Sequence, residues 1–272
     1  MLEHVGLLRG PALWMLGRRQ PDHIELDGCT YKVHPRDFGV TLELHSTGEY
    51  ESGTRQFLMS CLGPGMTFVD IGAHVGLFAI PAAKRVGSSG RVFAFEPNPS
   101  NRALLEKNIA ANQVQNMTVV PMAVSDCSGN MQLHCSPYNT GDHQLYYSGR
   151  GRRSVDVQVA RLDDFMREHG GEIDLVKMDV QGAEAKVLQG MTELMDRNRS
   201  ITLVVELSPW MLRDIGDDPL ELLEDLAARG FALSTMDESS GVLSPGSPHE
   251  VLQRCADGSY LNVMAQRKAE SA

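Results

Sequence analysis

The sequence has few cysteines and no long apolar run. Its five cysteines include no Cys-x-x-Cys pair, so we expect reduced thiols that serve mostly as small buried groups. No apolar run approaches the roughly 20 residues that cross a bilayer. Residues 1–21 lack a basic stretch followed by a continuous apolar stretch, so they predict a helix and not a signal peptide. These absences predict a cytoplasmic protein with no membrane partner.

Basic residues are scarce relative to acidic ones. The chain has 25 Lys and Arg against 35 Asp and Glu, for a formal net charge of -10 at pH 7. Because affinity for nucleic acid comes largely from clustered Lys and Arg, this balance argues against a nucleic-acid partner. The one basic cluster, at 149–154, is short and rich in glycine, and we interpret it as a solvated loop. The remaining composition, with 42% hydrophobic residues over 272 positions, is that of a globular protein with a full core.

Strand-like and helix-like segments alternate from residue 66 onward. Short apolar runs predict buried strands at 66–72, 91–97, 117–126, 173–180, 200–208, 231–237 and 259–267. Amphipathic segments predict helices at 77–87, 99–113, 183–197 and 218–230. This alternation predicts an α/β fold with a mostly parallel, doubly wound sheet. The last two strands are joined by a predicted loop rich in Gly, Ser and Pro, so we expect them to pair antiparallel.

Residues 1–52 predict an extension ahead of a main domain at 53–272. Within it, 23–35 and 40–51 alternate apolar and polar residues, which indicates short strands or a hairpin around Asp27-Gly28. The extension is a candidate lid, substrate-binding or oligomerisation element, and Tyr50 and Glu51 at its end would belong to the lid. Residues 54–62, which follow, predict a helix.

Five acidic residues stand at or just after the ends of predicted strands: Asp70, Glu96, Asp126, Asp179 and Glu206. Ligands of doubly wound sheets bind beyond the carboxyl ends of the strands. We therefore expect these carboxylates to border one site along that edge.

The loop after the first of these strands has the spacing Asp-x-Gly-x-x-x-Gly. A dinucleotide loop uses Gly-x-Gly-x-x-Gly, whose amides reach a diphosphate. Asp70 would repel a diphosphate by about 1 kcal/mol at 4 Å in water, and by more at a lower dielectric. S-adenosylmethionine carries an ammonium and a sulfonium but no phosphate, so it suits this loop better. The predicted contacts are Asp70, Gly72, Ala73, His74 and Gly76.

Other cofactor contacts are predicted at the next two strand ends. Glu96 can accept hydrogen bonds from both ribose hydroxyls, a role shared with NAD-binding folds. Pro97 would flank the adenine, and the backbone of Met122 and Ala123, with Asp126 nearby, would meet the adenine edge. Asp126 is equally interpreted as a turn or cap residue.

The stretches 68–112, 119–129, 161–165 and 173–191 resemble the FkbM family of S-adenosylmethionine-dependent methyltransferases, and the likeness spans roughly 53–199. The resemblance implies a class I methyltransferase fold, with a seven-stranded sheet whose last strand is antiparallel. It also implies methylation of hydroxyl oxygens on natural products, polyketide-type alcohols or sugars, and S-adenosylhomocysteine as the product of the cofactor.

Residue roles follow from the same resemblance. It assigns Asp70, Gly72 and Gly76 to the methionine end of the cofactor and Glu96 to the ribose. Asp179, with Gly182 and Glu184 in the second signature block, would lie beside the transferred methyl group.

Two positions depart from the family pattern. The family commonly has Asn at the position of His74 and Glu at the position of Gln181. With Gln181 in place of that Glu, this chain lacks one carboxylate that could act as a base or bind a metal.

An aliphatic hydroxyl needs a base to become a good nucleophile, and such a base contributes about 10²–10⁴-fold. The candidates are Asp179, Glu184, Glu206 and His143. Asp179 is the best placed of them, and orientation of the cofactor's amino group is its alternative role.

Metal dependence is not expected. Asp179 and Glu206 could approach one cation, but no Cys or His cluster supports a metal site.

Other functions stay open. They are methylation of a nitrogen or carboxylate, a silent cofactor-binding module, and nicotinamide-dependent oxidoreduction, which the glycine spacing disfavours. The acceptor is expected to be a small molecule, free or tethered to a carrier, and the oligomeric state is open, a homodimer included.

Overall fold

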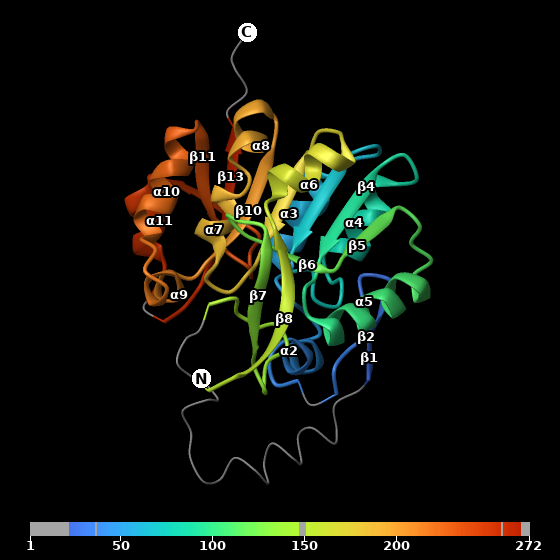
Figure 1. Ribbon diagram of the computed structural model, residues 1–272. Helices are drawn as coiled ribbons and strands as arrows, with labels where there is room; N and C mark the ends of the chain where they lie inside the picture. Colours follow the sequence, from blue (N-terminus) through green and yellow to red (C-terminus); the bar gives the residue numbers. More distant parts are fainter. Residues whose placement is uncertain (1–21, 36, 147–150, 257, 268–272) are drawn as a thin grey trace.

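The computed structural model describes residues 22–35, 37–146, 151–256 and 258–267 (Figure 1). The helix predicted within 1–21 lies outside the described residues, as does part of the basic cluster at 149–154. In the described part of the chain, no helix combines the length and apolar character needed to cross a bilayer.

The main sheet has eight strands in the order β12-β11-β13-β10-β9-β3-β4-β5. Their bounds are β3 Thr67–Ile71, β4 Arg91–Phe95, β5 Met117–Val120, β9 Leu175–Met178, β10 Thr202–Leu207, β11 Phe231–Met236, β12 Leu243–Gly246 and β13 Leu261–Arg267. Strands β3, β4, β5, β9 and β10 pair in parallel, and β13 is antiparallel to both β10 and β11. The predicted α/β sheet with seven strands and an antiparallel last strand is confirmed, with β12 as an addition.

The region predicted as a loop before the last strand contains β12 and a further helix. Helix α11, Pro248–Arg254, begins with a capping box in which Ser247 accepts from the Glu250 amide and Glu250 accepts from the Ser247 amide. Proline at the first helical position supports the same start. The loop predicted over 239–248 is wrong at β12, because an edge strand of the sheet tolerates a proline such as Pro245.

Side chains alternate between the two faces of the sheet, and each face carries its own hydrophobic cluster. Val69 and Ile71 belong to one cluster with residues of α6 (Leu162–His169), α7 (Glu184–Gln189), α8 (Thr192–Arg197) and α10 (Pro219–Ala228). Phe68 belongs to the other, with residues of α3 (Ser52–Cys61), α4 (Ala79–Val86) and α5 (Pro99–Ala111). Helix α9 is Pro209–Asp214.

The segment before α3 packs into the second cluster. Strands β1 (His23–Leu26) and β2 (Cys29–Lys32) form the predicted hairpin around Asp27-Gly28. The side chain of Asn108 on α5 holds the backbone of Lys32, accepting from its amide at 2.6 Å and donating to its carbonyl at 3.0 Å.

The strand predicted over 40–51 is wrong, because this stretch contains helix α2, Val40–Thr47. Its buried residues Val40, Thr41 and Leu44 have helical spacing, and Asp37 accepts from the Thr41 amide at 2.7 Å. The predicted helix that follows is confirmed as α3.

A second, three-stranded sheet was not predicted. It contains β6 (Met122–Val124), β8 (Arg153–Ala160) and β7 (Gly129–Cys135), in that order. Figure 1 shows β7 and β8 as a long ribbon alongside the main sheet. The strand predicted over 117–126 therefore divides between two sheets at Pro121, which has no amide hydrogen for a ladder.

The helix predicted over 183–197 also divides, into α7 and α8, around Gly190. A Cβ on Gly190 would lie 2.0 Å from the carbonyl oxygen of Ser125. The close approach of the chain after β6 explains why this position is glycine.

Candidate active site

The loop between β3 and α4 is shaped by its glycines. Gly72 has φ +86° and Gly76 has φ +94°, a region that residues with a Cβ rarely adopt. A Cβ on Gly72 would lie 2.1 Å from the Asp179 carbonyl oxygen, and one on Gly76 would lie 2.7 Å from Leu105. The amides of Gly72 and Ala73 both donate to the Phe95 carbonyl. The loop is thereby held close to the ends of β4 and β9.

A cavity of about 780 Å³, measured out to its opening into solvent, lies beside this loop. The predicted site residues that line it are Gly72, Ala73, His74, Glu96, Pro97, Ala123, His143 and Asp179. Those outside its wall are Asp70, Gly76, Met122, Asp126, Glu184 and Glu206. Most of the predicted cofactor contacts thus come together around one space.

Glu96 is buried at the end of β4 with both carboxylate oxygens held. One accepts from the His74 amide and the other from the Asn98 amide, each at 2.8 Å. Burial raises the pKa of Glu96 to about 7, against the lowering effect of these hydrogen bonds. The Asn101 side chain is a further hydrogen-bond partner of Glu96 and also lowers its pKa.

Asp70 lies beneath the loop and not at the rim of the cavity. It stands opposite Lys177 in the pairing of β3 with β9 and is only 1% exposed. Burial raises its pKa to about 6, although Lys177 opposes the shift. The Ala79 amide is a hydrogen-bond donor to this carboxylate and also lowers its pKa.

Lys177 is a functional candidate that the sequence reasoning missed. Its ammonium is buried, 3.8 Å from Asp179 Oδ2 and 4.3 Å from the ring centre of Phe78. Burial lowers the pKa of this ammonium, but the surrounding carboxylates raise it by more, so it stays charged. In the sequence, the feature that could have pointed to Lys177 is a single Lys inside the apolar run of β9.

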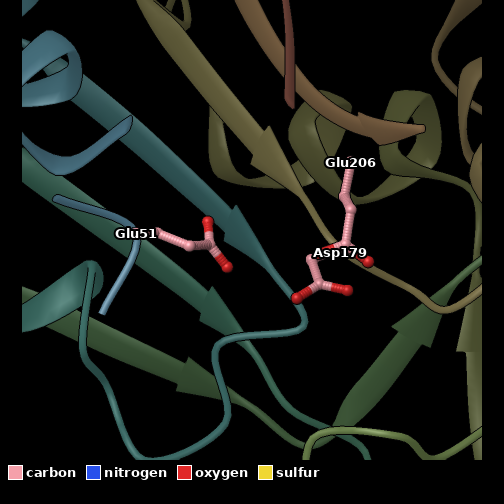
Figure 2. Close-up of side chains that lie close together, drawn as sticks. All are labelled: Glu51, Asp179 and Glu206. Atoms are coloured by element: carbon pink, nitrogen blue, oxygen red, sulfur yellow. The ribbon is translucent and has the colours of Figure 1, made fainter. Parts of the chain in front are cut away.

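Glu51, Asp179 and Glu206 form the acidic cluster of the site. Figure 2 shows their side chains converging from the N-cap of α3, the end of β9 and the end of β10. One oxygen from each lies within 4.8 Å of the others. Gln181 Nε2 donates to Asp179 Oδ1 at 2.6 Å and to Glu206 Oε1 at 2.9 Å. Glu51 had been considered only as part of a lid.

Two residues of the acidic cluster, Glu206 and Glu51, have raised pKa values. Burial, followed by the nearby Asp179 and Glu51, raises the pKa of Glu206 well above its ordinary value. Burial also raises the pKa of Glu51 to about 7, with Lys177 opposing. Burial therefore favours the protonated form of Glu206 at neutral pH.

Glu184 and Asp126 make local contacts outside the cavity. The fully buried Glu184 accepts from the amides of Val180 and Gly182, each at 3.2 Å, which holds the turn after β9. Asp126 accepts from the Ser125 hydroxyl at 3.2 Å.

His143 and His74 line the cavity in neutral form. Burial lowers the pKa of His143 to about 4 and that of His74 to about 3. His143 Nδ1 accepts from the Ser136 amide at 3.2 Å, and His74 Nε2 lies 2.8 Å from the Thr140 hydroxyl.

A second cavity, of about 740 Å³ to its solvent opening, adjoins the first. Asp179, Gln181 and Tyr50 border both spaces. The second also has Glu206, Trp210 and Tyr260 in its wall. Two ligands bound in these spaces would meet beside Asp179.

This arrangement of sheet, loop and cavity is that of the class I methyltransferases. One solved structure, described as an rRNA-methylase from Clostridium thermocellum, is similar to the chain with a TM-score of 0.50 and 13% identity. The match covers 80% of this chain and 94% of that chain, and it shows a likeness of fold. Residues 70–233 match the model of the methyltransferase FkbM domain. The chain belongs to the FkbM methyltransferase family, as its sequence indicated, and is a methyltransferase.

Curated relatives carry the same class of name. Methyltransferase sdnD of Sordaria araneosa is 29% identical over 197 residues, 61% of this chain and 73% of that protein. The 2-O-methyltransferase NoeI of Sinorhizobium fredii is 30% identical over 188 residues, 63% and 75% of the two chains. The hexuronic acid methyltransferase AglP of Haloferax volcanii is 30% identical over 142 residues, 50% and 53% of the two chains.

Proposed function

We propose that the protein transfers a methyl group from S-adenosylmethionine to a hydroxyl oxygen of a small molecule. The observation that carries this proposal is the pair of adjoining cavities that meet beside Asp179. The first, bordered by the glycine loop and Glu96, suits the cofactor. The second, with carboxylates and aromatic rings in its wall, suits a hydroxylated acceptor.

The cofactor residues have complementary tasks in this proposal. Glu96 would accept hydrogen bonds from the ribose hydroxyls, and Pro97 and Ala123 would border the adenine. Orientation of the cofactor's amino group by Asp179 is the alternative to its proposed role as a base. Asp70, which lies behind Lys177, would contribute negative charge from beneath the loop.

Methyl transfer is an in-line displacement at the methyl carbon. The acceptor oxygen forms the new C–O bond while the C–S bond breaks and its electron pair passes to sulfur. The positive charge of the sulfonium disappears, so a site shielded from water favours the transition state. The chain's main contribution would be to hold the acceptor oxygen about 3 Å from the methyl carbon.

Asp179 is our proposed base for the acceptor hydroxyl because it borders both cavities. Glu206 borders the second cavity, but burial favours its protonated form. His143 lines the first cavity, and Glu184 lines neither.

The name of one relative supports a hydroxyl acceptor, and that of another supports a sugar with both hydroxyl and carboxylate oxygens. NoeI is named for 2-O-methylation and AglP for methylation of a hexuronic acid. Whether the acceptor is free or carried by a protein, and whether the chain works as a homodimer, stay open within this proposal. The five cysteines, which include no Cys-x-x-Cys pair, support work in a reducing compartment such as the cytoplasm.

Two measurements test the proposal. Calorimetry should show saturable binding of S-adenosylhomocysteine and no binding of NADH, and the reverse result would contradict the methyl-donor assignment. Methyl-labelled S-adenosylmethionine should then label sugar or polyketide-type alcohol acceptors as ethers that survive mild alkali. Alkali-labile label would indicate a carboxylate acceptor, and cofactor binding without transfer across the panel would favour a silent module.

A further inference from the structure

We propose that Glu51, Asp179 and Glu206 form a binding site for a hard divalent cation of the Mg²⁺ class. One oxygen from each carboxylate lies within 4.8 Å of the others (Figure 2). Opposite ligands of a metal ion lie two bond lengths apart, about 4.0–4.2 Å for Mg²⁺ and about 4.6–5.2 Å for Ca²⁺. The 4.8 Å limit falls within the Ca²⁺ range and exceeds the Mg²⁺ range, so side-chain rotations that draw the three oxygens together would complete a Mg²⁺ site.

Glu51 provides the second observation. Its side chain is only 7% exposed, and Asn262 Nδ2 donates to Oε2 at 3.1 Å. The other oxygen, Oε1, is buried and has no hydrogen-bond partner in the described part of the chain. A buried carboxylate oxygen without a partner is costly. Because Glu51 is anchored through one oxygen and points into the acidic cluster, its free oxygen is available to a cation.

The carboxylates around Lys177 also favour a bound cation. Four carboxylates, Asp179, Glu51, Asp70 and Glu206, act on this one buried ammonium. When all four are ionised, the group is left with an excess of negative charge that is poorly screened by solvent. A divalent ion would offset most of this excess while leaving Lys177 in place.

The acidic cluster can also be reached by an ion from solvent. Asp179 and Glu206 border the second cavity, through which an ion can enter from solvent. Gln181 holds Asp179 Oδ1 and Glu206 Oε1, so the oxygens offered to the ion are Glu206 Oε2 and Asp179 Oδ2, the latter 3.8 Å from the Lys177 ammonium. The sequence predicted no metal requirement, because Asp179 and Glu206 stood without a Cys or His cluster; the structure adds Glu51, the N-cap of α3.

The task of the ion rests on the proposed methyl transfer. A cation at this position can ligate the acceptor oxygen and lower the pKa of its hydroxyl. The proton would pass to the Asp179 oxygen that does not bind the ion, the acceptor oxygen would bond to the methyl carbon, and the C–S electron pair would return to sulfur.

The test uses Mn²⁺ as a paramagnetic probe of the full-length, chelator-treated protein. Titration followed by electron paramagnetic resonance should show one saturable Mn²⁺ site per chain that Mg²⁺ displaces. Glu51→Gln should weaken the Mn²⁺ affinity at least ten-fold, and Glu206→Gln serves as a second variant. Glu43→Gln is the matched control, because Glu43 borders the second cavity outside the acidic cluster; it should keep the wild-type affinity.

Thermal unfolding of each variant confirms that it is folded before titration. Absence of a saturable Mn²⁺ site in the wild type, or an equal loss in Glu43→Gln, would overturn the inference. Binding of S-adenosylhomocysteine is measured on the same samples. If that ligand binds and Mn²⁺ does not, the cation site alone fails; if Mn²⁺ binds and S-adenosylhomocysteine does not, the proposed function fails while the cation site stands.

Discussion

The carbonyl oxygen of Asp179 occupies the space that a Cβ on Gly72 would need, with only 2.1 Å between the two positions. The glycine loop and the chain after β9 therefore approach as closely as their backbones allow. Both segments border the first cavity, so this contact fixes the part of the cavity wall that Gly72 and Asp179 form.

Gly72→Ala should destabilise the fold and abolish measurable binding of S-adenosylhomocysteine. The new methyl group meets a backbone atom, and the residue must also keep a positive φ, which alone costs about 1–2 kcal/mol. Gly216→Ala is the control, because Gly216 has φ +89° with open space around it. Denaturant unfolding should show a larger loss for Gly72→Ala than for Gly216→Ala; equal losses would mean that the loop moves aside.

Binding of S-adenosylhomocysteine should strengthen as the pH rises from 6 to 8. Burial raises the pKa of Glu96 to about 7, so its carboxyl group is mostly protonated at pH 6 and mostly ionised at pH 8. If only the ionised form accepts both ribose hydroxyls, the affinity rises about ten-fold over this range. Calorimetry on Glu96→Gln should give weaker binding with a flatter pH dependence. An unchanged slope in that variant would remove Glu96 from the ribose site.

Asp179→Asn should reduce kcat by about 10²–10⁴-fold, the usual contribution of a general base. The affinity for S-adenosylhomocysteine should change much less, because the side chain keeps its size and its contact with Gln181. Asp126→Asn is the control, since Asp126 lies outside both cavities. A parallel fall in kcat and cofactor affinity would instead make Asp179 a binding residue for the cofactor.

Asp163→Ala should destabilise the protein by about 1–2 kcal/mol without altering cofactor affinity. The buried Asp163 carboxylate accepts from the amides of Glu193 at 3.2 Å and Leu194 at 2.9 Å in the first turn of α8. Its neighbour Asp164 pairs with Arg167 on the surface, so Asp164→Ala should cost no more than about 0.5 kcal/mol. Urea unfolding compares the two, and equal losses would argue against capping.

The elements that sequence predicted well are those with a local signal. The strand containing Asp70 and the strand ending before Glu96 are short apolar runs closed by turn residues, and both were found where expected. The glycine loop was found where expected for the same reason, because its glycine spacing reflects a local requirement of the backbone; the cofactor contacts assigned to it stay a prediction. Predictions failed where a local pattern was ambiguous, as in the alternating segment that forms α2. They also failed where one apolar run contributes strands to two sheets, as on either side of Pro121.

The sequence by itself determined the α/β class, the order of most strands and helices, and the glycine loop, since alternation and turn residues act over a few neighbouring positions. The tertiary structure alone decided that Asp70 lies beneath the loop and that Glu51 joins Asp179 and Glu206 beside Lys177. These side chains come from distant parts of the chain, and their meeting depends on the crossover connections and on how α3 packs against the sheet. A pattern of neighbouring residues contains no information about that packing, which is why the acidic cluster became visible only in three dimensions.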